Sequence, residues 1–139
     1  MEKSFVVDNS VVMSWCFQDK ANPIADSVLD RLAEATAYVP SVWPLEVVNV
    51  LLAAERRKCI SEAYSIRFLN LLSQLPIFVQ YESPERAMRD ILGLARAHDL
   101  SSYDASYLDL AMKKGLPLAT LDKKLIKAAE AIKVAILHD

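Results

Sequence analysis

A chain of 139 residues with 53% hydrophobic residues and only two glycines is expected to form one compact, helix-rich domain over residues 1–139. Its formal net charge of -2 excludes a protein that coats duplex nucleic acid through a broad basic surface. No apolar run is long enough to span a bilayer, and the N-terminal segment is too short and too polar for a signal peptide, so the sequence predicts a cytoplasmic protein.

Short apolar strands alternate with helices along the chain. In chain order we expect a strand at 4–7, helices at 11–17 and 24–36, a strand at 37–39, helices at 42–57 and 61–74, a strand at 77–79, helices at 84–98 and 102–114, a strand at 117–119, a helix at 122–131 and a strand at 134–137. The segment 42–57 is apolar nearly all round, which predicts a buried helix. The alternation favours an α/β fold, a three-layer α/β/α sandwich around a short parallel sheet.

Four acidic residues stand at strand ends or in the first turns of helices: Asp8, Glu46, Asp104 and Asp122. The carboxyl ends of parallel strands face one crevice, so residues far apart in the sequence converge there. Crowded carboxylates repel one another and raise each other's pKa unless a cation lies among them. The sequence therefore predicts a pocket for a divalent metal.

Each acid also has a structural explanation when it is taken alone. Asp8 and Asp122 precede helices, where Asp is a favoured N-cap residue. Asp104 follows Ser101 by three residues, a variant of the capping-box spacing. Glu46 lies in an apolar helical segment, where an ionised carboxylate is costly unless it binds a metal or forms a buried salt bridge or cap. Capping does not predict that all four acids meet, whereas parallel topology does.

Polar neighbours of the acids are candidates for orienting substrate or water. Ser10 and Thr120 place hydroxyls beside two acids, and capping explains either hydroxyl equally well. Asn49, one turn after Glu46, is expected to orient that carboxylate or a metal-bound water. Lys123 is the first residue of the basic cluster next to Asp122 and is the expected phosphate contact, with a solvated surface charge as the alternative.

The remaining polar and aromatic residues support no other chemistry. His98 and His138 are expected to be structural or solvated, which removes the usual general base. No glycine-rich phosphate loop is present. Asp109 is interpreted as a surface or salt-bridge residue, and Cys16 and Cys59 as buried, reduced thiols. The larger aromatic residues are expected in the core or at an interface, with base stacking as the alternative: Trp15, Trp43, Tyr103 and Tyr107.

Four segments carry a resemblance to a known family: 7–10 (VDNS), 44–51 (PLEVVNVL), 100–108 (LSSYDASYL) and 115–122 (GLPLATLD). In this order the chain resembles a PIN-domain protein, and in size and layout it resembles a VapC-type toxin of a bacterial or archaeal toxin–antitoxin pair. The resemblance implies a Mg²⁺- or Mn²⁺-dependent ribonuclease whose acidic quartet maps onto Asp8, Glu46, Asp104 and Asp122, with Ser10 and Thr120 at the accompanying polar positions. It also implies a homodimer, and an antitoxin whose C-terminal tail crosses the active-site groove.

Hydrolysis of an RNA phosphodiester is the chemistry expected of this acidic site. Hard oxygen ligands select Mg²⁺ or Mn²⁺. Asp8 and Asp104 are the expected direct ligands, while Asp122 and Glu46 would bind a second metal or hold waters, one of them acting as base.

Other readings of the same sequence remain open. They are a housekeeping PIN nuclease in RNA processing and a catalytically silent PIN-fold module that binds proteins. A dehalogenase-like phosphatase is disfavoured because segment 8–10 lacks a second Asp. A receiver domain is disfavoured because no Asp follows strand 77–79.

Overall fold

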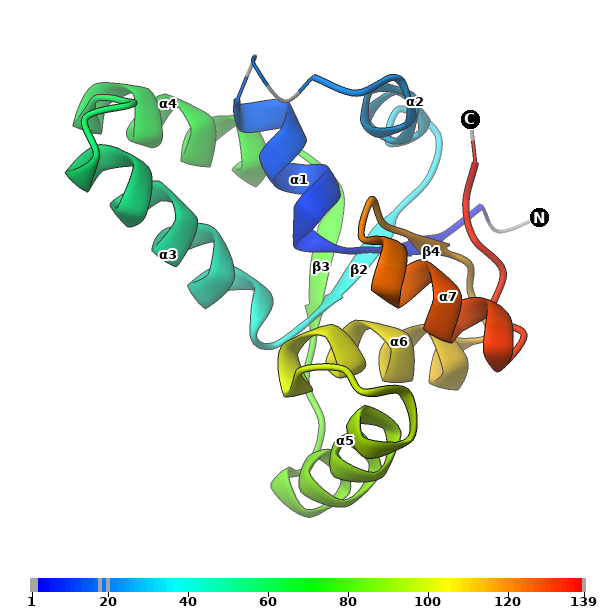
Figure 1. Cartoon of the computed structure of the whole chain (residues 1–139). Coiled ribbons are helices and arrows are strands. Elements are labelled where there is room, and N and C mark those ends of the chain that lie inside the picture. The colour runs from blue at the N-terminus through cyan, green and yellow to red at the C-terminus, as the bar shows by residue number, and fades with distance from the viewer. Residues whose placement is uncertain (1–2, 18, 20, 139) are drawn as a thin grey trace.

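The computed structural model describes residues 3–17, 19 and 21–138. The described residues form seven helices and four strands (Figure 1). In chain order these are β1 (Phe5–Val7), α1 (Asn9–Cys16), α2 (Pro23–Arg31), β2 (Ala37–Pro40), α3 (Trp43–Arg56), α4 (Glu62–Ser73), β3 (Ile77–Gln80), α5 (Pro84–His98), α6 (Ser102–Lys114), β4 (Leu118–Ala119) and α7 (Lys123–Ala131).

The four strands form one parallel sheet in the order β3-β2-β1-β4, so the predicted parallel α/β class is confirmed. β1 lies inside the sheet and is fully buried, in keeping with its run of Phe and Val. Val7 pairs with Ala119, and the next amide, Asp8 N, donates to Ala119 O at 2.9 Å. The ends of β1 and β4 therefore lie side by side, which places the segments after them at one edge of the sheet.

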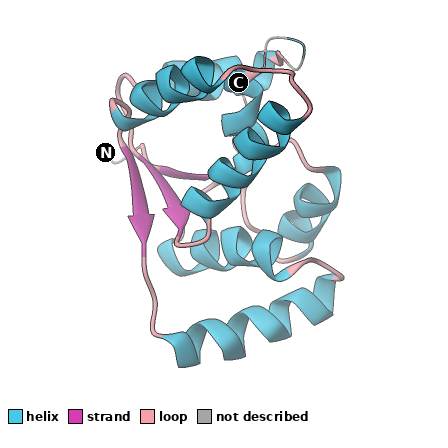
Figure 2. Cartoon of the chain, turned by 90° about the vertical axis from the view of Figure 1, so that its left-hand side faces the viewer, coloured by secondary structure: helices cyan, strands magenta, loops and turns pink. Residues whose placement is uncertain are grey.

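Helices cover the sheet and position its carboxyl edge. α6 packs against β1, β2 and β4, and α1 packs against α2 and α3. Helices lie above and below the strands in Figure 2, and α3 and α4 form a hairpin beside α1 in Figure 1. Within the ranges that the structure describes, no helix has both the length and the apolar character needed to cross a membrane.

The prediction of a last strand at 134–137 is wrong, because this segment does not form an extended strand. It is reduced to a single parallel bridge between Leu118 and Ile136, because β4 is only two residues long and offers little edge to pair with. The helix predicted at 24–36 ends at Arg31, where the chain enters a turn before β2.

The prediction that the helix 42–57 is buried is wrong for one of its sides. Leu45, Val48 and Leu52 are exposed to 71%, 43% and 38%, and their spacing of three and four residues places them in one row. The opposite side of α3 faces the core through its buried residues, which are Trp43, Val47, Leu51 and Ala54. α3 thus presents an apolar row (Leu45, Val48, Leu52) that is exposed along its length, most of all at Leu45.

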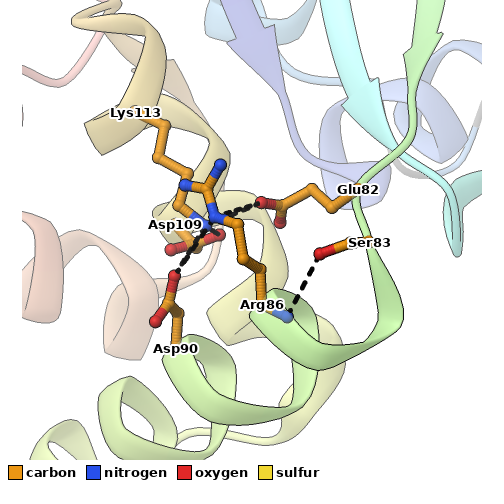
Figure 3. Close-up of polar contacts among 6 residues, drawn as sticks. All are labelled: Glu82, Ser83, Arg86, Asp90, Asp109 and Lys113. Carbon is orange, nitrogen blue, oxygen red and sulfur yellow. Dashed lines mark hydrogen bonds and ion pairs between the residues drawn. The ribbon is translucent and has the colours of Figure 1, made fainter.

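A cluster of charged residues fastens α5 to α6 (Figure 3). Lys113 Nζ lies 2.8 Å from Glu82 Oε1, 2.8 Å from Asp109 Oδ2 and 3.1 Å from Asp90 Oδ2. Arg86 lies at the edge of the cluster, 3.9 Å from both Glu82 and Asp90. The Asp109 side chain is only 7% exposed, so the salt-bridge interpretation of this residue is confirmed and the surface interpretation is wrong.

The two cysteines differ in burial. Cys16, the last residue of α1, is buried as predicted, and burial raises the pKa of its thiol to about 11. The prediction is wrong for Cys59, which is exposed because it lies in the connection between α3 and α4 at the surface.

Candidate active site

One pocket of about 430 Å³, the acid pocket, is lined by all four predicted acids. Asp8 follows β1, Glu46 and Asp104 lie in the first turns of α3 and α6, and Asp122 caps α7. The other residues of its lining are Asn9, Ser10, Met13, Ser14, Phe17, Val50 and Leu121. The parallel topology therefore brings together acids that are up to 114 residues apart (122 − 8).

Two hydroxyl groups hold the carboxylate of Asp8. Ser10 Oγ donates to Asp8 Oδ2 at 2.7 Å, and Thr120 Oγ1 donates to the same oxygen at 2.8 Å. Asp8 occupies the N-cap position of α1, yet among the described residues none donates a helix-capping hydrogen bond to its side chain. The capping explanation thus fails for Asp8, whose side chain is directed to the pocket side of the β1 end.

The same hydroxyls tie the chain after β4 to the end of β1. Asp122 N donates to Thr120 Oγ1 at 3.1 Å, and Leu121 N donates to Ser10 Oγ at 3.0 Å. Each hydroxyl therefore accepts from the backbone near α7 and donates to Asp8. Ser10 and Thr120 position the first acid against the last one, a role that capping alone does not require.

Glu46 is oriented by a tyrosine from α6. Tyr107 Oη donates to Glu46 Oε1 at 2.5 Å, and Tyr107 is fully buried. Sequence reasoning assigned Tyr107 to the core or an interface and missed this contact. Its position three residues after Asp104 was the available signal, because residues three apart share a helix face.

Asp104 and Asp122 differ in how their helix ends are capped. Ser101 Oγ caps α6 by accepting from Asp104 N at 3.1 Å, so the backbone of Asp104 is used and its carboxylate lines the pocket. Asp122 Oδ1 accepts from Lys124 N at 2.8 Å and from Leu125 N at 3.2 Å. Asp122 is therefore an N-cap, so the capping explanation is correct for this residue, and its side chain lines the pocket as well.

Burial and mutual repulsion act together on the acids. Burial is the largest cause that raises the pKa of Asp8, of Glu46 and of Asp104. The charge of Asp8 raises the pKa of both Glu46 and Asp104, and the charge of Asp122 raises that of Asp8 and Asp104. The hydroxyls of Ser10, Thr120 and Tyr107 oppose these shifts by donating to the ionised carboxylates. The four charges thus form one coupled group.

Lys124, the neighbour of Lys123, is a lysine whose charge acts on an acid of the pocket. The charge of Lys124 lowers the pKa of Asp104, and Lys124 Nζ pairs with the exposed Asp99 at 3.3 Å. Lys123 is exposed at the first position of α7 and is not among the described residues that line the pocket.

Asn49 also differs from its predicted position, since it is exposed and is not one of the described lining residues. A residue three positions after Glu46 is turned by about 60° around the helix, and one four positions after it by about 40°. Val50 accordingly lines the pocket. The amide that does border the pocket is Asn9, whose buried Oδ1 has no hydrogen-bond partner among the described residues.

The chemistry of the lining suits a hard divalent cation. Four carboxylates give an all-oxygen donor set, and the unpartnered Asn9 amide oxygen lies beside them. As they stand, no three acidic, His or Cys side chains of the described chain have the spacing needed to hold a metal ion.

Comparison with known proteins assigns the chain to a family. The sequence profile of the PIN domain matches residues 5–131. The chain belongs to the PIN domain family. The match spans β1 to α7 and therefore includes all four acids of the pocket.

Three relatives of this PIN domain illustrate the similarity. Ribonuclease VapC3 of Pyrobaculum aerophilum is 27% identical over 127 residues, which cover 91% of this chain and 95% of that protein. The structure of Mycobacterium tuberculosis VapC20, a sarcin-ricin loop cleaving toxin, aligns with a TM-score of 0.66 at 12% identity, covering 97% and 99% of the two chains. A chain of a toxin–antitoxin complex from Klebsiella pneumoniae aligns with a TM-score of 0.65 at 16% identity, covering 96% of each chain. These two structural similarities show that the fold is shared.

Proposed function

We propose that this PIN domain is a Mg²⁺- or Mn²⁺-dependent endoribonuclease and the toxin of a toxin–antitoxin pair. The observation that carries the proposal is the acid pocket, which carboxylates from four separate segments line and in which three of these carboxylates have a raised pKa. Perturbed acids gathered in a cleft mark functional sites, because a fold gains no stability from like charges held together. The similarity to a protein named ribonuclease supports RNA as the substrate.

Asp8 and Asp104 would hold the metal directly, and Glu46 and Asp122 would hold its waters or a second cation. When bound, Mg²⁺ or Mn²⁺ supplies Lewis acidity that activates water and stabilises the negative charge developing on the phosphate. Asp8 is the best fixed of the four, because two hydroxyls hold one of its oxygens. Lys123, exposed beside Asp122, remains a proposed phosphate contact.

Glu46 is the acid best suited to take a proton from the attacking water. Its Oε1 is held by Tyr107, which leaves Oε2 to accept the proton. Burial and the charges of Asp8 and Asp104 raise the pKa of Glu46, which brings it closer to the working pH of a general base.

Tyr107→Phe is expected to move the acidic limb of the pH–rate profile to higher pH. The hydroxyl of Tyr107 lowers the pKa of Glu46, so its removal raises that pKa and leaves less of the base ionised at a given pH. On that limb the rate should fall roughly tenfold for each unit by which the pKa rises. The profile of Tyr81→Phe, which removes a hydroxyl from a tyrosine that is 79% exposed, should match wild type. An unshifted limb for Tyr107→Phe would remove Glu46 as the base.

A protein partner and a homodimer complete the proposal. The apolar row of α3 is exposed, and exposed apolar groups in a row are typical of interaction surfaces. The similarity to a chain from a toxin–antitoxin complex supports an antitoxin as one partner. The absence of metal-binding spacing among the described acids favours a second candidate, a catalytically silent binding module of the same fold.

The test is cleavage of structured RNAs, including tRNA and ribosomal fragments, by purified protein free of antitoxin. The expected result is cleavage with Mg²⁺ or Mn²⁺ and none with EDTA. Calorimetry with Mn²⁺ separates the two candidates, because a binding module need not hold the ion. No cleavage with any metal, together with no Mn²⁺ binding, would reject the nuclease in favour of the binding module.

A further inference from the structure

A second pocket, of about 610 Å³, adjoins the acid pocket. Phe17 and Val50 line both pockets, so the two share a wall. The second pocket, called the arginine pocket below, is also lined by Arg57, Tyr64 and Arg67. It lies where the end of α1 meets the α3–α4 hairpin (Figure 1).

Hydrogen bonds between helices build this pocket. Tyr64 Oη donates to the carbonyl oxygen of Cys16 and thereby fixes α4 to the end of α1. Ser65 Oγ donates to Glu55 Oε2 at 2.5 Å and fixes α4 to α3. The wall that carries Arg67 is therefore held in place, and the guanidinium of Arg67 lies 5.7 Å from the centre of the Tyr64 ring.

The charges of the arginine pocket are opposite to those of its neighbour. Arg57 and Arg67 are exposed, and neither forms a salt bridge with any described residue. Asp19 is the one acid in the described lining, so the lining carries an excess of one positive charge. The acid pocket contributes four carboxylates and repels a polyanion, whereas the arginine pocket attracts one.

We infer that the arginine pocket binds the RNA backbone beside the bond to be cleaved, with Arg57 and Arg67 contacting phosphates. The inference rests on the proposed ribonuclease function and names the path of its substrate. Guanidinium groups bind phosphate through paired hydrogen bonds, and unpaired arginines lose no existing ion pair when they do so. An RNA strand that leaves the acid pocket past Phe17 and Val50 enters the arginine pocket, because these two residues line both pockets. This continuity with the proposed cleavage site favours RNA over an acidic protein segment as the occupant.

The test measures binding of a fluorescein-labelled single-stranded RNA by anisotropy, in EDTA so that no cleavage is expected, over a range of salt concentrations. Arg57→Ala/Arg67→Ala should weaken affinity on the order of tenfold and reduce the slope of log K against log salt by about 1.4, the value for two single-strand phosphate contacts at about 0.7 each. Arg57→Lys/Arg67→Lys keeps both charges and should restore most of the slope. If the alanine pair folds poorly, Arg57→Gln/Arg67→Gln removes the same two charges at nearly the same side-chain length and should show the same losses of affinity and slope.

A matched control removes two arginines elsewhere. Arg89→Ala/Arg96→Ala causes the same loss of charge on two exposed residues of α5, which lies at the bottom of Figure 1, far from α4 at the top. This variant should keep wild-type affinity and slope. Equal losses in both double variants would overturn the inference, because binding would then depend on net charge alone.

Three further outcomes are decisive. An unchanged affinity for RNA in the Arg57/Arg67 variant overturns the inference even if the wild type cleaves RNA. Loss of binding to a poly-glutamate peptide without loss of binding to RNA also overturns it and assigns the pocket to an acidic protein segment. Weakened RNA binding in a protein that cleaves nothing supports the pocket and rejects the nuclease, so the two proposals fail separately.

Discussion

Asp104→Asn is expected to abolish metal-dependent RNA cleavage, with a loss on the order of 10²–10³-fold or more, because it removes a proposed ligand of the metal that would stabilise the transition-state charge. The substitution keeps the size of the side chain and removes its charge. The fold should persist, because the structural hydrogen bond at this position comes from the backbone N–H to Ser101 Oγ. The readout is the initial rate of cleavage with Mn²⁺ in saturating RNA.

The control for this prediction is Asp99→Asn, which makes the same chemical change five residues away. The Asp99 side chain is 97% exposed, so solvent screens its ion pair with Lys124, and its backbone is left-handed with φ of 54°, a conformation that Asn also tolerates. Asp99→Asn should cleave at the wild-type rate. Wild-type cleavage by Asp104→Asn, purified identically, would show that Asp104 contributes neither a ligand nor a charge to the reaction.

The sheet edge and its four acids could be predicted from the sequence because topology alone decides them. Short apolar strands between helices favour parallel pairing, and parallel pairing sends the ends of β1 and β4 to one edge. Local signals were as informative: Pro84, His98, Ser102 and Lys114 bound α5 and α6 where the predicted ranges ended. Such signals depend on neighbours in the sequence and need no knowledge of the packed molecule.

The contacts that orient the acids could not be predicted, because they depend on how each helix is rotated in the packed molecule. Tyr107 reaches Glu46 across 61 residues of sequence; its spacing from Asp104 places it on the same helix face, but that spacing does not specify Glu46 as its partner. Rotation of α3 also decides that Val50 borders the pocket, that Asn49 does not, and that Leu45 is exposed. Hydrophobic periodicity predicts which side of a helix is apolar. It does not predict how far the helix is rotated about its own axis, and a difference of one residue changes which side chain borders the pocket.

Mn²⁺ is expected to raise the melting temperature of the protein, and more at neutral pH than at pH about 5. A cation that binds only the folded state stabilises it by about 2.7 kcal/mol when its free concentration is 100 times the Kd, which corresponds to several degrees. Bound metal needs ionised ligands, and protons compete with it at low pH. Thermal denaturation in Mn²⁺ and in EDTA, between pH 5 and 8, measures the difference.

The same acids fix the sign of the pH dependence in EDTA. Folding raises the pKa of Asp8, Glu46 and Asp104, so in the window between the unfolded and folded values the native state binds more protons than the unfolded state. The stability that these three groups contribute is therefore complete below their unfolded pKa and is lost as pH rises through the folded pKa. Asp104→Asn removes one of the repelling charges, so its melting temperature in EDTA should exceed that of wild type increasingly as pH rises.

These two dependences must occur together if the acid pocket is a metal site. The Asn variant should gain stability in EDTA and lose the stabilisation by Mn²⁺, while Asp99→Asn should behave as wild type in both conditions. The repulsion among the carboxylates of the acid pocket lowers the stability of the fold. A bound divalent cation would offset that loss in the working protein, which explains why the carboxylates are kept. Equal melting temperatures with and without Mn²⁺ at every pH would show that the acid pocket is not a metal site. Asp122 would then serve as an N-cap, and Asp8 would serve to accept the hydrogen bonds of the two hydroxyls.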